Sequence, residues 1–296
     1  MRTLHVDSGR EMRGGQWQAL RLVERLPAEG IAATLLCRRG SPLAARALER
    51  GVDARPLSLW NIAALARRVD LVHAHDARAH LLAALAAPRT PLVVARRVAF
   101  PIRLGWKYRR PAHFVAVSRH VREILTAAGV PGGRVSVVYD GVPLLPVPAG
   151  ERRGVLAPAF DDPMKGGALV REAAALAGVP VRFSADLEAD LGGAALFVYI
   201  THSEGLGSAA LLAMSACTPV IASNAGGLPE IVEDGVGGLL VENSAAAIAR
   251  AIERLLTDPP FARALAERAR RTLEERFSVD AMVRGTIDVY RKVLAC

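Results

Sequence analysis

Cysteine is scarce in this chain of 296 residues. Cys37, Cys217 and Cys296 are odd in number and far apart, and none belongs to a CxxC pair. A disulfide framework and a structural zinc site are therefore not expected, and the reducing cytoplasm is the predicted compartment.

Long apolar runs are also missing. No stretch approaches the roughly 20 apolar residues that a membrane-spanning helix needs. The first residues, Met1 to Val6, lack the apolar segment of a signal peptide. We therefore expect no transmembrane segment and interpret Thr3–Val6 as the first strand of the fold.

Aromatic residues make up only 5 % of the chain, whereas hydrophobic residues make up 51 %. Ala, Val and Leu must then form the core, as they do where helices pack on parallel sheets whose strands are buried on both faces. The length favours two domains of about 150 residues each. Aliphatic strand patterns alternate with helical patterns throughout, which predicts an α/β fold.

A segment rich in proline and glycine, Val142 to Gly150, is the best candidate for a linker, and it contains Pro143, Pro146 and Pro148. We therefore predict an N-terminal Rossmann-like domain over residues 1–145 and a C-terminal one over residues 150–278. A final helix over residues 279–296 is expected to cross back onto the first domain.

The net charge is +9 and the isoelectric point is near 10.3, which suits anionic partners without choosing among them. One basic segment, Arg103 to Arg110, combines four cations with Trp106 and Tyr108. Such a mixture suits an anionic membrane surface, although a plain exposed loop is equally compatible. No RRM, KH, zinc or helix-turn-helix signature accompanies it, so nucleic acid is not an expected partner.

The densest functional motif is Ser203–Ser208, which directly follows the predicted strand Leu196–Ile200. Loops at the carboxyl ends of parallel strands are where open α/β sheets bind ligands. Gly205 and Gly207 would let the backbone approach a ligand, and the following helix would direct N–H groups at an anion. The alternative is a glycine-rich turn with a solvated Glu204.

Three further loops have similar features. Lys165 lies in the loop from Asp161 to Gly167, the loop Asn224–Glu230 follows the strand Val220–Ala222, and Gly14 and Gly15 precede the first long helix. Together, the four glycine-bearing loops predict an interdomain cleft lined by N–H donors and suited to a diphosphate.

At this point the sequence resembles the GT-B glycosyltransferases of glycosyltransferase family 4, retaining enzymes of bacterial envelope and polysaccharide assembly. The strongest block is HSEGLGSAALLAMSACTPVIASNAGGLPEIVEDGVGGLLVE, from His202 to Glu242. The segments AVSRHVREILTAAGVPGGRVSVVYDGV, DLVHAHDARAHLLAAL and ERFSVDAMVRGTIDVYRKVL also resemble the family, so the likeness covers almost the whole chain. It implies two Rossmann-like domains with parallel sheets facing a central cleft.

The resemblance implies roles for particular residues. Glu204 matches the first Glu of the family's E-x7-E motif, which holds sugar hydroxyls, and Lys165 matches the lysine that neutralises the diphosphate. Donor binding would further involve Gly14, Gly15, Gly205, Leu206, Gly207 and Ser208. Family members need no metal and no cofactor besides the nucleotide-sugar substrate.

This chain departs from the family pattern at three places. The second Glu of E-x7-E, which grips the ribose, falls on Leu212, and Ala159 stands where an arginine normally accompanies Lys165. Leucine cannot accept a ribose hydroxyl, and the loss of arginine removes a bidentate phosphate contact. Between Lys165 and Glu204, the chain also lacks roughly one βα unit of about 30 residues.

Two further groups of residues have both a functional and a purely structural interpretation. His73 and His75 alternate along a strand and share one side of it, but no third ligand is obvious from the sequence, so no metal site is expected. Arg97 follows the strand Leu92–Ala95, where many relatives carry a histidine facing the acceptor. It is the candidate residue on the acceptor side, with surface charge as the alternative.

The resulting hypothesis is a metal-independent retaining glycosyltransferase of the hexosyltransferase type. It would move a sugar from a nucleotide-diphospho-sugar to an envelope glycan or a lipid-linked acceptor, in the cytoplasm or peripherally on the inner membrane. The main alternative is a non-catalytic relative with a degenerate donor site that acts as a binding or scaffold protein. Epimerisation of a sugar nucleotide would need carboxylates in the cleft that the sequence does not identify.

Overall fold

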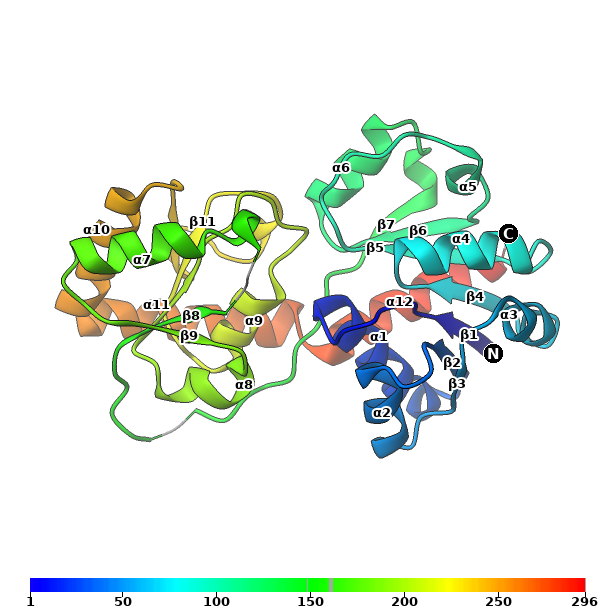
Figure 1. Cartoon of the computed structure of the whole chain (residues 1–296), viewed down its shortest axis with the longest axis horizontal. Coiled ribbons are helices and arrows are strands. Elements are labelled where there is room, and N and C mark those ends of the chain that lie inside the picture. Colours follow the sequence, from blue (N-terminus) through cyan, green and yellow to red (C-terminus); the bar gives the residue numbers. More distant parts are fainter. Residues whose placement is uncertain (148, 160–161, 296) are drawn as a thin grey trace. The chain divides into compact units, whose positions relative to one another are not determined.

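The computed structural model describes residues 1–147, 149–159 and 162–295, so Pro148, Phe160, Asp161 and Cys296 lie outside the described residues. The chain divides into two units (Figure 1). Unit 1 comprises Met1–Asp140 together with Val279–Cys296, and unit 2 comprises Gly141–Ser278. Each unit has its own parallel sheet and its own buried core.

Unit 1 contains a seven-stranded sheet in the order β3-β2-β1-β4-β5-β6-β7, with every pair parallel. The aliphatic runs form its central strands, which are almost wholly buried because helices cover both faces. The strands are β1 (Arg2–Val6), β2 (Ala32–Cys37), β3 (Ala54–Pro56), β4 (Leu71–Ala74), β5 (Leu92–Arg96), β6 (His113–Ala116) and β7 (Val135–Val137).

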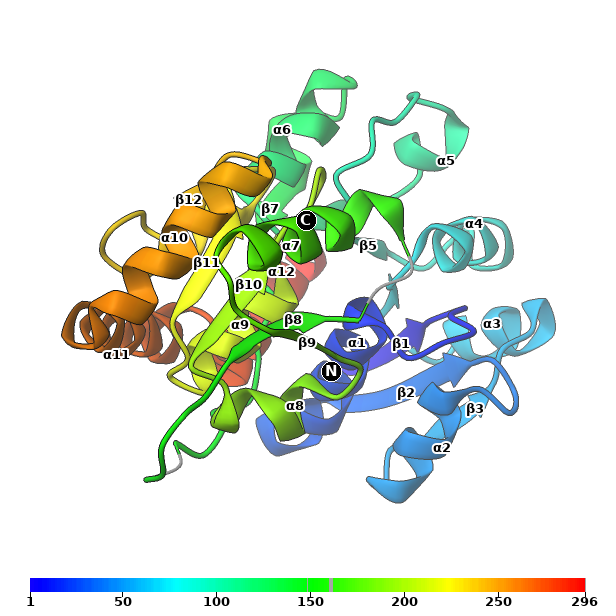
Figure 2. The same ribbon diagram turned by 60° about the vertical axis from the view of Figure 1, so that its left-hand side comes forward.

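The helices of unit 1 form two sets. They are α1 (Gly14–Arg25), α2 (Pro42–Glu49), α3 (Leu59–Ala66), α4 (Ala77–Ala86), α5 (Trp106–Arg109), α6 (Arg119–Ala127) and α12 (Val279–Leu294). Helix α1 packs against α2 and α12, whereas α3 packs against α4, and α4 against α5 (Figure 2). The strand order reverses next to β1, and crossovers between parallel strands are right-handed. Helices α1 and α2 therefore lie on one face of the sheet, and α4 and α6 lie on the other. The last helix thus lies on unit 1, where Met282, Ile287 and Tyr290 join the core.

Unit 2 contains a five-stranded parallel sheet in the order β12-β11-β10-β8-β9. Its strands are β8 (Val155–Pro158), β9 (Val181–Ser184), β10 (Leu196–Tyr199), β11 (Val220–Ser223) and β12 (Leu239–Val241). Its helices are α7 (Gly167–Leu176), α8 (Leu187–Asp190), α9 (Ser208–Ser215), α10 (Ala245–Thr257) and α11 (Pro259–Arg276). Between Lys165 and Glu204 the chain forms only α7, β9, α8, the short helix η4 (Leu191–Gly193) and β10.

The expected α/β class with two parallel sheets is therefore confirmed. The sequence patterns did not identify β3, α3 or α8, each of which has eight residues or fewer. Such short elements carry too few turns or alternations to show a period. The segment Val142–Gly150, expected as a linker, belongs to unit 2, and its described residues form no helix or strand beyond an isolated bridge from Val142 to Ser278.

Candidate functional site

The strand order reverses once in each sheet, between β8 and β10 in unit 2 and between β1 and β4 in unit 1. Open α/β sheets bind ligands outside the carboxyl ends of the strands at such a reversal. In unit 2 the loop with Lys165 follows β8, and the loop with Glu204 follows β10. The topology therefore brings these two predicted residues to one place.

Lys165 and Glu204 form an ion pair, with 2.7 Å between Lys165 Nζ and Glu204 Oε2. Their side chains are 23 % and 15 % exposed, so the pair is largely shielded but still reachable from solvent. The second carboxylate oxygen, Oε1, accepts a hydrogen bond from the Gly205 amide at 3.0 Å. Both charges are thus oriented before any ligand arrives.

Tyr199, the last residue of β10, is a third member of this group. Its hydroxyl donates to Glu204 Oε2 and lies 3.3 Å from Lys165 Nζ. Burial, with the Glu204 carboxylate beside it, raises the pKa of Tyr199, so the hydroxyl stays protonated and acts as a donor. The sequence analysis did not identify Tyr199 because it ends an aliphatic strand, although a polar tip at a strand end beside a glycine loop is a usable signal.

Two glycine loops interlock behind Glu204. A Cβ atom on Gly226 would lie well inside contact distance of the Glu204 carbonyl oxygen, and one on Gly227 would do the same to the Gly205 carbonyl oxygen. The Gly227 amide donates to the Glu204 carbonyl at 3.1 Å. The loop Asn224–Glu230 therefore supports the Glu204 loop through its backbone, which only glycine permits at this approach.

Helix α9 begins directly after the loop that contains Glu204. Its N-cap residue is Gly207, which lies in the left-handed region at φ +113°. No side chain caps the helix, and no acidic residue lies in its first turn. Its first N–H groups are therefore suited to an anion. Leu206 is buried and contributes to packing, whereas Ser208 is half-buried at the start of the helix.

The two departures from the family pattern differ in their surroundings. Leu212 is half-buried on α9, next to the fully buried Leu211. Ala159 is exposed just after β8, and its amide donates to the Ser184 carbonyl at 2.7 Å. Neither side chain provides a polar group.

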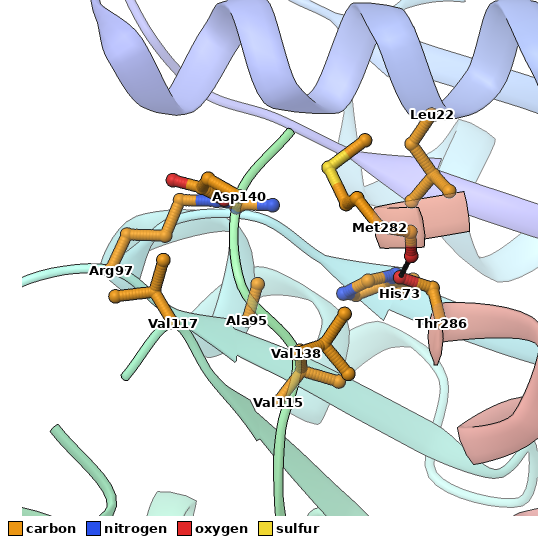
Figure 3. A pocket seen from close by; sticks show the side chains of 10 residues that line it. All are labelled: Leu22, His73, Ala95, Arg97, Val115, Val117, Val138, Asp140, Met282 and Thr286. Carbon is orange, nitrogen blue, oxygen red and sulfur yellow. Dashed lines mark hydrogen bonds and ion pairs between the residues drawn. The ribbon is translucent and has the colours of Figure 1, made fainter. Parts of the chain in front are cut away.

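In unit 1 the edge at the strand reversal is organised by Arg97. Its Nε donates to Asp140 Oδ1 at 3.0 Å (Figure 3), and its Nη1 lies 3.4 Å from His75 Nδ1. The Arg97 and Asp140 side chains are only 14 % and 8 % exposed. A Cβ on Gly15 would be 3.8 Å from Arg97 Cδ, so the predicted glycine loop and Arg97 are neighbours. Arg97 is thus a held group and not a freely solvated charge.

The loop between β1 and α1 is held by a buried carboxylate. Asp7 accepts hydrogen bonds from the Gly9 amide at 2.8 Å and from Gln16 Nε2 at 3.1 Å. Helix α1 starts at Gly14 with no side-chain cap and no acid in its first turn. The predicted Gly14–Gly15 site therefore has uncapped N–H groups on a fixed loop.

A row of three buried histidines lies behind Arg97. His5 on β1 lies opposite His73 on β4 in the strand register, and its Nδ1 is 3.0 Å from His75 Nε2. The sequence analysis found no third ligand beside His73 and His75, and this was wrong, because nitrogen atoms of all three lie within 4.8 Å of one another. The pairing of β1 with β4 brings His5 into the row, although it lies 68 residues before His73 in the chain.

The hydrogen bonds of this row fix the tautomers of His75 and His5. Since Arg97 can only donate, His75 Nδ1 accepts, His75 Nε2 donates to His5 Nδ1, and His5 Nε2 donates to Thr3 Oγ1 at 3.0 Å. The Tyr290 hydroxyl is hydrogen-bonded to His73 Nδ1 at 2.6 Å. Burial lowers the pKa of all three rings, that of His5 to about 3, so the row is neutral. Two of the three rings already use their lone pairs, and the Arg97 cation is adjacent, which opposes a metal ion.

His73 Nε2 has no partner among the described residues. It lines a small cavity of about 10 Å³ that also borders Arg97, Asp140 and Thr286 (Figure 3). A space of this size holds about one water molecule. The cavity is therefore suited to a solvent molecule that satisfies His73, and it is too small for a sugar.

The basic segment Arg103–Arg110 contains both buried and exposed residues. Tyr108 is buried and packs on His80 and Phe114, whereas Trp106 is 55 % exposed. Arg110 donates to the carbonyl oxygens of Ala87 and Thr90 and therefore has a structural role.

Comparison with known proteins assigns both units. A model described as Glycosyltransferase Family 4 matches residues 12–144, and one described as Glycosyl transferases group 1 matches residues 181–272. The chain belongs to glycosyltransferase family 4. The two matches together cover about three quarters of the sequence and include the loops with Arg97 and Glu204.

Solved structures of GT-B glycosyltransferases share the fold of this chain. HepE of Anabaena, in complex with UDP-glucose, superimposes with a TM-score of 0.87 at 18 % identity, covering 99 % of this chain and 100 % of that one. The lipopolysaccharide outer core galactosyltransferase WaaB superimposes with a TM-score of 0.73 at 14 % identity, covering 99 % and 100 % of the two chains. At these identities the likeness concerns the fold alone.

Curated relatives match over shorter segments. An alpha-maltose-1-phosphate synthase of Mycobacterium tuberculosis is 38 % identical over 112 residues, which is 36 % of this chain and 29 % of that protein. A D-inositol 3-phosphate glycosyltransferase of Saccharomonospora viridis is 39 % identical over 100 residues, which is 32 % of this chain and 22 % of that protein. The chain thus matches less than a third of the length of these relatives.

Proposed function

We propose that this protein transfers a glycosyl group from a nucleotide-diphospho-sugar to a hydroxyl acceptor, with the donor held by unit 2. The observation that carries the proposal is the Lys165–Glu204 pair at the strand reversal, beside the uncapped start of α9. A cation, a carboxylate and helix N–H groups are the three features that a sugar diphosphate needs, because its sugar offers hydroxyls and its diphosphate offers negative charge.

The ion pair suggests how donor binding would proceed. The diphosphate takes over Lys165, and the released carboxylate of Glu204 accepts hydroxyls of the sugar, while Tyr199 remains a donor to Glu204. Lys165 and the start of α9 then stabilise the charge that develops on the leaving diphosphate. HepE and the related structures with UDP or UDP-glucose support a uridine nucleotide as the first donor to test.

On the acceptor side, Arg97 is the candidate residue. Asp140 and His75 hold its guanidinium at the carboxyl edge of the unit 1 sheet, beside Gly15. Fixed geometry of this kind favours positioning, since a group that is held in place loses little freedom when it binds. We infer a glycan or lipid-linked acceptor, transfer with retention and without a metal ion, and a cytoplasmic location.

The experiment is a transfer screen by mass spectrometry with UDP-, GDP-, ADP- and dTDP-sugars and simple glycoside acceptors, run with wild type, Glu204→Gln and Lys292→Ala. Lys292 is an exposed lysine on α12 and serves as the control. We expect one donor class to be consumed by wild type and by the control but not by Glu204→Gln. Equal turnover in all three proteins would refute the assignment of Glu204.

The second candidate is a non-catalytic family 4 protein that binds a nucleotide-sugar or partner without transferring it. Leu212 and Ala159 favour it, because neither provides the polar contact that the family pattern places there. Isothermal titration separates the candidates. Donor binding that is lost in Lys165→Ala, with no turnover of any sugar in the screen, would favour the binding protein.

A further inference from the structure

Positive charge in this protein is concentrated in one stretch of unit 1. Residues 57–110 contain ten arginine and lysine residues, two aspartates and no glutamate, which is +8 of the chain's net charge of +9. This stretch runs from just before α3 to just beyond α5. The rest of the chain is therefore nearly neutral overall, and this stretch carries almost all of the net positive charge that favours an anionic surface.

Both aspartates of this stretch are used inside the fold. Asp70 accepts a hydrogen bond from the Arg2 amide at 2.7 Å. Asp76 caps α4 and accepts from the amide and hydroxyl of Ser8 at 2.6 and 2.7 Å. Neither carboxylate forms an ion pair with the basic residues of the stretch among the described residues. Apart from Arg97, which pairs with Asp140, the basic residues of the region form no ion pair among the described residues.

The same stretch exposes large apolar side chains. Half of the exposed large hydrophobic residues among the described ones lie here, namely Leu59, Trp60, Leu81, Leu85, Val98, Phe100 and Trp106. Trp60 is 81 % exposed, Phe100 60 % and Trp106 55 %. Exposed aromatic residues that coincide with unneutralised positive charge need an explanation other than packing.

These residues belong to neighbouring elements. Helix α3 packs against α4 and α4 against α5 (Figures 1 and 2). His80 of α4 is 2.7 Å from the Lys107 carbonyl, and Thr90 donates to the Ala66 carbonyl at 2.8 Å. We name the exposed side of these three helices, with the loop from Val98 to Arg103, the α3–α5 surface.

The helices order apolar and basic side chains along this surface. On α4 and just beyond it, the exposed residues Arg78, Leu81, Leu85 and Arg89 follow one another at helical spacing. On α3, Trp60 lies one turn before Ala64 and two turns before Arg67 and Arg68, all of them exposed. An apolar strip flanked by arginines, with no acid, is the pattern of a protein face that lies in a lipid headgroup region.

We propose that the α3–α5 surface docks on an anionic lipid bilayer, with Trp60, Leu81, Leu85 and Trp106 at the headgroup boundary and the flanking arginines on lipid phosphates. Among the described residues no helix is long and apolar enough to cross a membrane. Val98 and Phe100 directly follow Arg97, so the docked surface borders the acceptor-side edge of unit 1. This proposal is independent of the proposed function, because docking needs no glycosyl transfer.

The test is flotation of the full chain with phosphatidylcholine vesicles and with vesicles that also contain phosphatidylglycerol. Two double variants address the surface: Leu85→Ser with Trp60→Ser, and Arg78→Glu with Arg89→Glu. Matched controls change equally exposed residues elsewhere: Leu48→Ser with Leu176→Ser, and Arg250→Glu with Arg263→Glu. Circular dichroism checks that every variant is folded.

We expect binding only to the anionic vesicles, a blue shift of tryptophan fluorescence on binding, and weakening of at least about tenfold in each surface variant. The control variants should bind like wild type. Equal weakening in the controls, or binding that ignores phosphatidylglycerol, would overturn the proposal. The proposal would also be overturned if the wild-type protein failed to bind vesicles and instead bound DNA or self-associated through the apolar strip.

Discussion

The residues at the two strand reversals of this protein differ in their electrostatics. In unit 2 a charged pair, Lys165 and Glu204, remains partly open to solvent and can exchange partners. In unit 1 a row of neutral buried histidines backs a single guanidinium that Asp140 also holds. If unit 2 holds the donor and unit 1 the acceptor, as proposed, the donor site can rearrange on binding and the acceptor site is fixed beforehand.

Lowering the pH should produce the largest difference in stability between the two units. Burial lowers the pKa of His5 to about 3 and those of His73 and His75 well below the usual value, so these rings stay neutral in the folded protein and take up protons only on unfolding. Above the unfolded pKa, about 6.5, the three buried rings cost no stability. As the pH falls below that value, the unfolded state takes up protons that the folded state does not. The free energy of unfolding therefore decreases by about 4 kcal/mol per pH unit for three histidines.

The three tryptophans all lie in unit 1, so their fluorescence follows that unit alone, while hydrogen exchange measured by mass spectrometry follows both. Unit 1 should lose protection between pH 6.5 and 5, and unit 2, whose one histidine is the exposed His202, should keep it. Simultaneous loss in both units would break the comparison.

Removal of the Arg97 side chain should have the next largest effect on the free energy of unfolding. Arg97→Ala leaves the buried Asp140 without its guanidinium, and breaking a buried ion pair costs about 3–5 kcal/mol. Arg96→Ala is the control, because that half-buried arginine forms no ion pair among the described residues and donates to the Phe100 carbonyl. Urea unfolding should rank the two variants in this order. A cost for Arg97→Ala no larger than that of its neighbour would show that the guanidinium is not held as described.

The glycine interlock of unit 2 gives a matched pair of tests. Gly226 and Gly235 both have positive φ, +58° and +71°, but only at Gly226 would a Cβ meet the backbone of Glu204. Alanine at Gly235 should cost about 1 kcal/mol of unfolding free energy from backbone strain alone. Alanine at Gly226 should cost about 1–3 kcal/mol more through the clash and should also weaken donor binding. Equal costs at both positions would contradict the interlock.

The smallest effect concerns Leu212, where the family pattern has the ribose-binding glutamate. Because Leu212 is half-buried and not part of the core, Leu212→Glu should preserve the melting temperature and tighten nucleotide binding by about tenfold or more, the value of one charge-assisted hydrogen bond. Leu211→Glu, at the fully buried neighbour, should unfold the helix instead. Destabilisation by Leu212→Glu without tighter binding would mean that α9 has been repacked and that the nucleotide lies elsewhere.

The sequence predicted what depends on local patterns. Aliphatic runs located most strands, and glycines after them located the loops around Glu204 and Gly15. It missed His5 and Tyr199, because their importance comes from strand pairing and from contacts across loops that no local period encodes. It could not distinguish the buried Tyr108 from the exposed Trp106, since the exposure of an aromatic residue in a basic segment depends on what packs over it. Tertiary contacts, and not propensity, decided these cases.

The central claim is that Lys165 and Glu204 hold opposite ends of one donor. Isothermal titration of UDP and of UDP-glucose into wild type, Lys165→Ala and Glu204→Gln tests it most directly. Lys165→Ala should weaken both ligands by about 1.5–3 kcal/mol, since both carry the diphosphate, whereas Glu204→Gln should weaken only UDP-glucose, whose sugar it contacts. Unchanged affinities in Lys165→Ala, or equal losses for both ligands in Glu204→Gln, would contradict the account.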